Sequence, residues 1–307
     1  MFDFLTEEIP NQEIELPALA QRNIRLSVKR EDRIHPYISG NKYRKLKYNL
    51  LEARKLGKDH LLSFGGAYSN HIAAVAAAGK EEGFRTTGVI RGEELEGKIE
   101  ENPTLSYAAS CGMKFKFISR TAYRDKTSDK FLQALRAETD DFFLIPEGGT
   151  NELAVKGCEE ILTEKDAQFN YICSSIGTGG TIAGLINCSK LSQQVLGFPA
   201  LKGSFLQEDI RKFASKDNWK LIDSYHFGGY AKVNTDLVQF MNDFKTATGI
   251  LLDPVYTGKM MYGILDLVKE GYFKEGSRIL AIHTGGIQGI PGMNSQLVKR
   301  GLPIIEI

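Results

Sequence analysis

Short apolar runs alternate with helix-forming segments along most of the 307-residue chain. The runs have the length and residue content of buried strands, and the segments between them have helical periodicity or helix-forming composition. Strands separated by helices pair readily in parallel, because each helix carries the chain back across the sheet. The alternation therefore predicts an α/β fold with mostly parallel sheets.

The expected elements follow one another with tight connections. Strands are predicted at 60–64, 86–90, 114–118, 142–145, 171–174, 195–197 (the weakest pattern) and 278–282. Helices are predicted at 48–56, 70–82, 103–111, 154–165, 181–190, 236–247 and 260–269. No long linker, internal repeat or low-complexity tract interrupts them, so the chain is expected to fold as one large domain or as two lobes between which it crosses more than once.

Composition excludes several classes of partner. The formal net charge of +1 and the 25% of charged residues suggest neither nucleic acid nor an anionic membrane as a binding surface. No apolar run approaches the roughly 20 residues that span a bilayer, and residues 1–10 do not resemble a signal peptide. A cytoplasmic location is the expectation. The five histidines lack metal-ligand spacing, so no metal is expected, and the four cysteines are expected to be reduced, buried and apolar in role.

A glycine-rich loop lies between the predicted strand at 171–174 and the helix at 181–190. Gly177, Gly179 and Gly180 allow positive φ and close backbone approach, and Thr178 and Thr181 add hydroxyl donors. The N–H groups at the following helix start would face an anion. The loop has neither the sixth-position glycine of a dinucleotide fingerprint nor the lysine of a Walker A loop. A monophosphate site is favoured, and a glycine-rich turn without a ligand is the alternative.

A lysine and a polar helix start complete a possible cofactor site. Lys42 follows the turn-forming pair Gly40-Asn41 and precedes a helix expected to begin near Tyr43, although its basic neighbours also suit an ordinary solvated helix face. Ser69 suits an N-cap, and the segment from Ser69 to His71 could bind a carboxylate, with Asn70 placed to bond a cofactor oxygen; plain capping is equally consistent with it. A reactive amine, a phosphate cradle and a polar helix start are what a protein needs to bind pyridoxal 5'-phosphate (PLP).

The order of these motifs resembles the fold-type II PLP enzymes, most closely the 1-aminocyclopropane-1-carboxylate (ACC) deaminase and D-cysteine desulfhydrase group. The resemblance extends over nearly the whole chain and rests on segments 29–32, 40–46, 65–71, 177–181, 253–259 and 283–286. It implies a tryptophan synthase β-subunit-like architecture of three-layer, open twisted sheets in two lobes. The large PLP-binding domain would comprise 1–45 and 153–307, the smaller domain 46–152, and the protein would be a homodimer.

The resemblance also implies a role for each motif residue. Lys42 would be the Schiff-base lysine, Asn70 would bond the ring hydroxyl, and Gly177, Thr178, Gly179, Gly180 and Thr181 would hold the phosphate. Ser69, Asn70 and His71 would bind the substrate, with Ser69 contacting its carboxylate and moving a proton. Tyr230 and Tyr256 match the pair of active-site tyrosines of this group; without the motif, each would be read as a core residue.

Two positions separate the group's activities. ACC deaminases have a segment similar to 253–256, followed by a glutamate that faces the pyridine nitrogen; this chain has Thr257 at that position. In place of Thr284, ACC deaminases tend to have an apolar residue, whereas the desulfhydrases have threonine. A hydroxyl at Thr284 would leave the pyridine nitrogen neutral, a weaker electron sink that suits loss of a good leaving group. The resemblance thus favours conversion of D-cysteine to pyruvate, ammonia and hydrogen sulfide over ACC deamination to 2-oxobutanoate and ammonia. A non-catalytic ligand sensor on the same scaffold is a remote third possibility.

For the other candidate residues, a purely structural role is the alternative to a role in the site. His283 could lie in the site or only support a strand end, and the segment 147–151 could line the cleft or form a turn capped by Asn151. Arg30 and Asp32 are expected to pair structurally. The sequence does not specify the physiological substrate or its stereochemistry.

Overall fold

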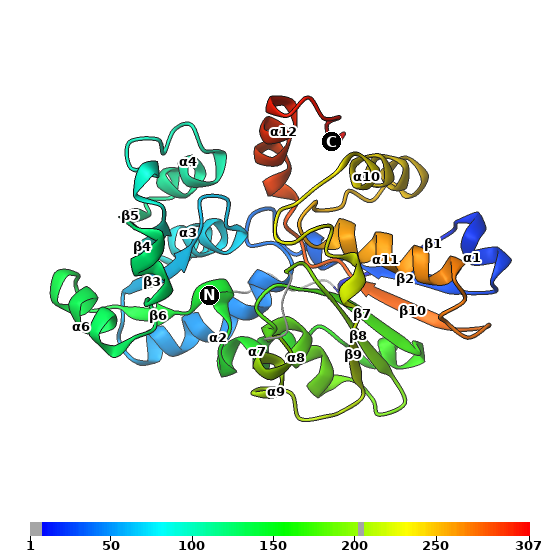
Figure 1. The fold of residues 1–307 in the computed structure, drawn as a ribbon. Helices are drawn as coiled ribbons and strands as arrows, with labels where there is room; N and C mark the ends of the chain where they lie inside the picture. Colours follow the sequence, from blue (N-terminus) through cyan, green and yellow to red (C-terminus); the bar gives the residue numbers. More distant parts are fainter. Residues whose placement is uncertain (1–7, 202–205) are drawn as a thin grey trace.

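Two separate, mostly parallel β-sheets form the centre of the protein (Figure 1). The computed structural model describes residues 8–201 and 206–307. The larger sheet has the strand order β1-β2-β10-β7-β8-β9, formed by Asn11–Ile14, Arg25–Lys29, Arg278–Ile282, Tyr171–Ile176, Gln194–Pro199 and Trp219–Leu221. The smaller sheet has the order β5-β4-β3-β6, formed by Lys114–Ile118, Arg85–Arg91, His60–Gly65 and Phe143–Ile145. Among the strand pairs of these described residues, only β1–β2 is antiparallel.

Helices cover both faces of the larger sheet, because neighbouring strand residues point to opposite faces and both are apolar. Leu196 points to one face of the sheet, where it belongs to a core with residues of α10 (Thr235–Thr248) and α11 (Thr257–Lys269). Helices α1 (Pro17–Gln21) and α12 (Ile290–Lys299) add residues to the same core. Val195, the neighbour of Leu196, belongs to the other face, with α7 (Glu152–Cys158), α8 (Gly180–Cys188) and α9 (Leu206–Arg211). This is the three-layer arrangement predicted from the sequence.

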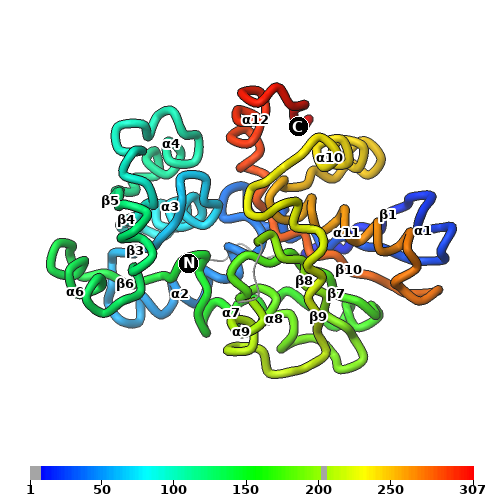
Figure 2. The backbone as a smooth tube through the Cα atoms, in the orientation of Figure 1, coloured from blue at the N-terminus to red at the C-terminus, as the bar shows by residue number. Residues whose placement is uncertain are grey.

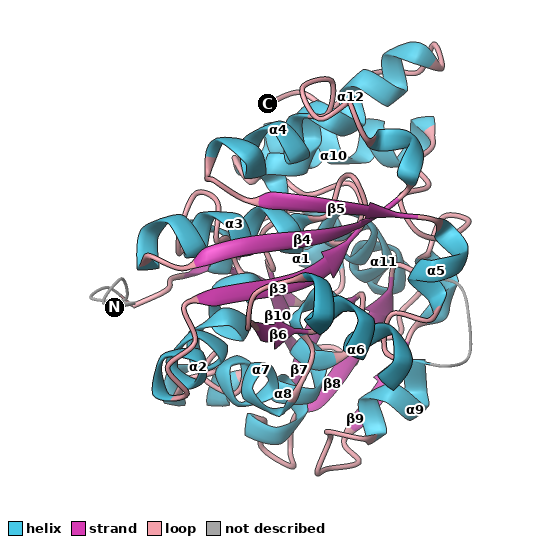
Figure 3. Ribbon diagram, turned by 90° about the vertical axis from the view of Figure 1, so that its left-hand side faces the viewer, coloured by secondary structure: helices cyan, strands magenta, loops and turns pink. Residues whose placement is uncertain are grey.

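The smaller sheet is covered in the same way. Leu61 packs with α2 (Asn41–Lys55), α3 (Asn70–Glu82) and α4 (Pro103–Ser110), and Leu62 packs on the opposite face with α5 (Arg120–Arg124) and α6 (Asp129–Glu138). Figure 3 shows β5, β4 and β3 side by side with these helices around them. In Figure 2 the backbone leaves the larger sheet after β2, enters the smaller lobe through α2 and returns through α7. The two sheets are compatible with the predicted domains, whose boundaries stay a prediction.

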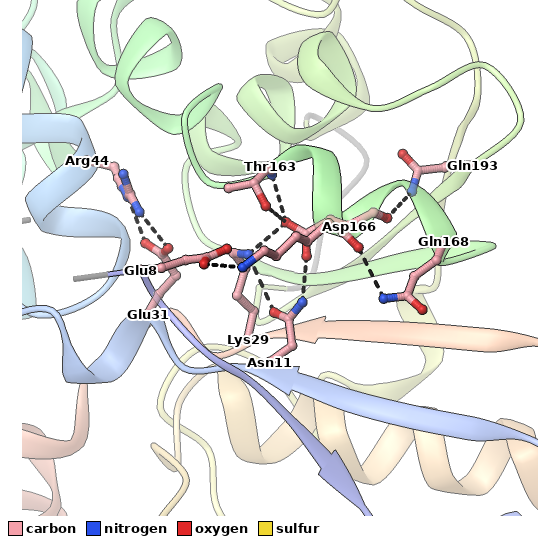
Figure 4. A network of polar contacts seen from close by, with 10 residues as sticks. Glu8, Asn11, Lys29, Glu31, Arg44, Thr163, Asp166, Gln168 and Gln193 are labelled. Carbon is pink, nitrogen blue, oxygen red and sulfur yellow. Dashed lines mark hydrogen bonds and ion pairs between the residues drawn. The ribbon is translucent and has the colours of Figure 1, made fainter.

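A buried ion pair fastens the start of the chain to the larger lobe (Figure 4). Lys29, on β2, lies 2.7 Å from the Asp166 carboxylate, and both side chains are almost fully enclosed. Asn11 of β1 donates to the same carboxylate at 2.7 Å, and the N–H of Thr163 donates at 2.8 Å. The hydrogen bonds compensate the cost of enclosing two charges.

Some predicted boundaries were wrong. The predicted helix 154–165 ends at Cys158, because Thr163 and Asp166 form a capping box that starts a separate 3₁₀ helix, Glu164–Gln168. The predicted helix 48–56 begins earlier, at Asn41, with Gly40 at φ 58° as its N-cap. Strands β1, β2 and β9, and helices α1, α5, α6, α9 and α12, were not predicted.

Three further observations concern the described residues as a group. Their helices include none long and apolar enough to cross a membrane. No cluster of histidine, cysteine and carboxylate side chains within 8–201 and 206–307 could hold a metal ion. The four cysteines are free thiols; Cys158 and Cys173 are buried, whereas Cys111 and Cys188 are partly exposed, which corrects the expectation that all four are buried.

Candidate active site

Loops from the two lobes meet where the parallel strands end at their carboxyl edges. A Cβ atom on Gly148, after β6, would lie 2.8 Å from the Thr178 hydroxyl, after β7. A Cβ on Gly286, after β10, would lie 2.8 Å from the side-chain nitrogen of Asn70, after β3. Open α/β sheets bind ligands at this edge, so the contacts define the candidate site.

The glycine loop after β7 is shaped to bind an anion. Gly179 has φ 86° and is the N-cap of α8, and no side chain caps the helix. A Cβ on Gly177 would lie 3.2 Å from the Tyr256 ring, and one on Gly180 would lie 2.8 Å from the Thr150 hydroxyl. A side chain at either position would crowd these neighbours at the start of α8. These N–H groups and the helix dipole favour negative charge.

Lys45 contributes a positive charge to this loop, and the sequence analysis missed it. Its buried ammonium donates to the Gly148 carbonyl at 2.9 Å, to the Thr150 hydroxyl at 3.0 Å and to the Thr178 hydroxyl at 3.4 Å. Burial lowers its pKa to about 8. The signal was available, since residues three apart share a helix face and Lys45 is three residues after Lys42.

Lys42 lies in the first turn of α2 and is linked through the Asn41 side chain to Thr181 of the glycine-rich loop, residues 177–181, which we call the phosphate loop. Its amine donates to the Asn41 side-chain oxygen at 3.2 Å, and the Asn41 amide donates to the Thr181 hydroxyl at 2.8 Å. Burial, with a smaller contribution from the neighbouring Lys45 charge, lowers the Lys42 pKa to about 7. A large fraction of Lys42 is therefore a neutral, nucleophilic amine at neutral pH. The solvated-face alternative does not describe this residue.

The start of α3 faces the loop after β10. Ser69 is the N-cap and accepts a hydrogen bond from the Ile72 N–H at 3.3 Å, as predicted. The Asn70 oxygen accepts from Gln288 at 3.4 Å. His71 points back toward its own sheet, where its Nε2 lies 2.8 Å from the Ser63 hydroxyl, and burial holds its pKa well below the usual value. Ser69 and Asn70 thus lie beside the loop after β10, and their contact with a ligand stays a prediction, whereas His71 is neutral and enclosed.

The two predicted tyrosines lie together. The ring centroids of Tyr230 and Tyr256 are 6.1 Å apart at 66°, and Tyr256 is the N-cap residue of α11. Burial raises the pKa of both hydroxyls, so both stay protonated and can donate hydrogen bonds at neutral pH.

The two threonines used to separate the activities differ in what their hydroxyls bond. The Thr257 hydroxyl accepts from the Asp253 N–H at 2.8 Å and donates back to the Asp253 carbonyl at 3.4 Å. The Thr284 hydroxyl lies 3.3 Å from that of Ser175. Thr257 thus serves the backbone at the start of α11, which leaves Thr284 as the hydroxyl available to a cofactor.

The smaller lobe adds charged and aromatic groups near the site, of which only Glu147 lies in a segment predicted as a candidate. Arg91 ends β4 with its guanidinium near Gly66 and 5.6 Å from the Tyr123 ring centroid. The Tyr123 hydroxyl donates to Glu147 at 2.8 Å, and Lys126 pairs with the same carboxylate at 3.1 Å. No local motif marks these residues, because they converge only through the fold.

The remaining candidates have structural roles. His283 donates to the Leu251 carbonyl at 2.7 Å and accepts from the Gly285 N–H at 3.2 Å, so its ring supports the strand end. Asn151 caps α7 by accepting from the Ala154 N–H at 2.9 Å, while Gly148 and Thr150 line the phosphate end. The segment 147–151 therefore forms the predicted turn capped by Asn151, and its residues Gly148 and Thr150 also lie beside Lys45 and Thr178. Arg30 pairs with Asp32 at 2.7 Å, as predicted.

The site fits PLP on its own geometry. The glycine cradle, the uncapped α8 start and the Lys45 ammonium suit a monophosphate. A second lysine with its pKa lowered to about 7 lies one hydrogen-bonded residue away from that cradle and suits an aldehyde.

Known proteins are similar to this chain over most of its length. Residues 5–285 match the model of the pyridoxal-phosphate dependent enzyme family. A Pyrococcus horikoshii protein named provisionally as an ACC deaminase is 33% identical over 85% of this chain and 84% of its own. The bifunctional D-cysteine desulfhydrase/ACC deaminase of Arabidopsis thaliana is 31% identical over 86% of this chain and 73% of its own. A crystal structure of an ACC deaminase homologue superposes with a TM-score of 0.84 at 27% identity, covering 97% of this chain and 95% of its own. The chain therefore belongs to the pyridoxal-phosphate dependent enzyme family, and its cofactor is PLP.

Proposed function

We propose that the protein is a deaminating lyase of D-cysteine desulfhydrase type, releasing pyruvate, ammonia and hydrogen sulfide from D-cysteine. The observation that carries the proposal is the partly buried Lys42 amine, which has its pKa lowered to about 7 and is linked through Asn41 to Thr181 of the glycine-rich loop. Relatives in this group are named for such deaminations. PLP supplies an electron sink that stabilises negative charge at the substrate Cα.

Each residue of the site has a proposed role that follows from its position. Lys42 would hold the cofactor aldehyde and, as a free amine, would take the proton from the substrate Cα. The Ser69 hydroxyl and the first N–H groups of α3 bind the substrate carboxylate, aided by the positive charge of Arg91. The protonated hydroxyls of Tyr230 and Tyr256 face the Cβ substituent and donate to the departing sulfur. The phosphate is held by residues 177–181 with Lys45.

The preference for β-elimination rests on Thr284. Its hydroxyl, 3.3 Å from that of Ser175, would offer the pyridine nitrogen a hydrogen bond in place of a carboxylate. A neutral nitrogen gives a weaker electron sink, which suffices for thiolate loss but opposes opening of an unactivated cyclopropane.

A parallel assay of one holoenzyme preparation on D-cysteine, L-cysteine, D-serine, β-chloro-D-alanine and ACC tests the substrate assignment. We expect the highest kcat/KM with D-cysteine. Higher kcat/KM with ACC would establish the alternative, ACC deamination to 2-oxobutanoate. Protein that binds an amino acid without turning over any of the five would instead indicate a ligand sensor.

We also propose a homodimer in the cytoplasm, in line with the family resemblance and the charge balance of the chain. Light scattering on the eluted holoenzyme tests the dimer; a single monomer mass at micromolar concentration would contradict it.

A further inference from the structure

Lys259 is a buried lysine that neither the cofactor nor the substrate contacts in the proposed function. It lies in the first turn of α11 with 1% of its side chain exposed. Its ammonium donates to the backbone carbonyls of His226 at 2.9 Å and Gly229 at 2.8 Å. No ion pair joins it to a carboxylate in the described part of the chain. Its hydrogen bonds are thus directed to a single loop.

That loop has an unfavourable backbone conformation. Among the described residues only three other than glycine have positive φ, and two of them, Phe227 and Ala231, both at 53°, flank Tyr230. Gly228 and Gly229 have φ of 89° and 119°. A non-glycine residue in this conformation is strained and persists only where surrounding contacts hold it. The two carbonyl bonds from Lys259 are contacts of this kind.

The loop and the helix each carry one tyrosine of the pair. Tyr230 lies inside the strained segment, and Tyr256 is the N-cap of α11, three residues before Lys259. Lys259 therefore joins the backbone that carries Tyr230 to the helix turn that carries Tyr256. Tyr230 is 44% exposed, so its position depends on the backbone of its loop as well as on the neighbouring Tyr256 ring.

We propose that Lys259 is a positioning residue that sets the placement of Tyr230 against Tyr256. The inference deepens the proposed function, because it assumes that the two hydroxyls act on the substrate. A purely structural role would instead lower stability and reduce activity regardless of whether Tyr230 keeps its hydroxyl.

A double-mutant cycle separates the two roles. In holoenzyme saturated with PLP, Lys259→Met should lower kcat for the best substrate of the panel about 10- to 100-fold, the size expected for misplacing a catalytic group by about 1 Å. The same change in a Tyr230→Phe background should cost less than about 2-fold, and the PLP dissociation constant should change less than about 2-fold. Lys269→Met, at the exposed end of the same helix, is the matched control and should match wild type.

The result that overturns the proposal is an equal loss of kcat from Lys259→Met with and without the Tyr230 hydroxyl. If Lys259→Met does not fold, Lys259→Gln, which keeps two N–H donors on a shorter chain, replaces it in the same cycle with the same two outcomes. If wild-type holoenzyme turns over no panel substrate, the proposed function fails, and the cycle is read on the dissociation constant of D-alanine, followed by cofactor absorbance. Non-additive constants would still support the positioning role, and additive ones would overturn it.

Discussion

The two ends of the site differ in how completely the protein has already bonded its own polar groups. At the phosphate end, Lys45 bonds three oxygens from both lobes, and Asn41 bonds Thr181. At the tyrosine end, Tyr230 is 44% exposed and lies in a strained loop. Across from it, no hydrogen bond or ion pair holds the Arg91 guanidinium within the described ranges 8–201 and 206–307.

This difference separates binding of the cofactor from choice of the substrate. A phosphate end whose donors are fixed before ligand arrives loses little further freedom on binding, and it suits a cofactor retained through every turnover. Groups with unfilled hydrogen-bonding capacity can adapt to the substrate and the departing group. We therefore expect substitutions at the phosphate end to change cofactor affinity, and those at the tyrosine end to change kcat and specificity.

Lys42 should give the largest effect, because it serves both ends. Lys42→Ala should lower kcat by at least about 10⁴-fold, the upper range for loss of a general base, and should abolish the cofactor absorbance near the visible edge. Lys47→Ala is the matched control, since Lys47 lies on the same helix but pairs with Glu160 at 2.7 Å, outside the site. Steady-state kinetics on D-cysteine measure the loss; turnover by Lys42→Ala close to wild type would sink the assignment.

Lys45→Met should act on the cofactor rather than on the chemistry. A hydrogen bond from a charged donor is worth about 1.5–3 kcal/mol, so PLP should bind roughly 10- to 100-fold more weakly. With the site saturated, kcat should stay within a few-fold of wild type. Titration of apoprotein with PLP gives the dissociation constant. An unchanged constant together with a large loss of kcat would contradict the division between the two ends.

The phosphate end could be predicted because its signals are local. Gly177, Gly179 and Gly180 follow one strand and precede one helix, and Lys42 follows a turn, so each is recognisable in a short segment. The family, the α/β fold and the cofactor predicted from these motifs are confirmed. The tyrosine end depends on contacts between lobes. Arg91 and Tyr123 come from different elements, and nothing in their neighbouring residues marks them; Glu147 was indicated only by its place after a predicted strand.

The fold shows the same limit. Strands flanked on both faces by helices were found from their apolar runs, whereas β1 and β2 were missed because charged residues interrupt them. Lys29 in β2 is buried only because Asp166, 137 residues away, neutralises it. The helix predicted at 154–165 was too long, because the composition of the whole segment favours helix. The same residues can either continue one helix or start a new turn with the Thr163–Asp166 cap, and contacts from elsewhere in the fold select the cap.

Thr284 and Thr257 form a matched pair for a smaller effect at the substrate end. Thr284→Val removes a hydroxyl offered to the cofactor and should lower kcat/KM for D-cysteine about 5- to 10-fold, the value of roughly one neutral hydrogen bond. Thr257→Val removes a bond at the start of α11, so it should lower stability by about 1 kcal/mol while kcat/KM stays within about 2-fold. Kinetics and thermal unfolding of both variants decide this; equal kinetic losses would show that both hydroxyls act on the reaction.

The smallest expected effect joins the two ends through charge. Burial, followed by the Lys45 charge, lowers the Lys42 pKa to about 7, so the neutral amine fraction rises about tenfold per pH unit below 7 and levels off above it. The rate at which apoprotein captures PLP should follow that curve between pH 6 and 9 in stopped-flow absorbance. Removing a neighbouring positive charge makes the protonated amine less unfavourable, so Lys45→Met should move the midpoint upward, by less than about one pH unit because burial dominates. Lys47→Met should leave the midpoint in place. A downward shift in Lys45→Met would mean that Lys45 acts on Lys42 through packing rather than through its charge.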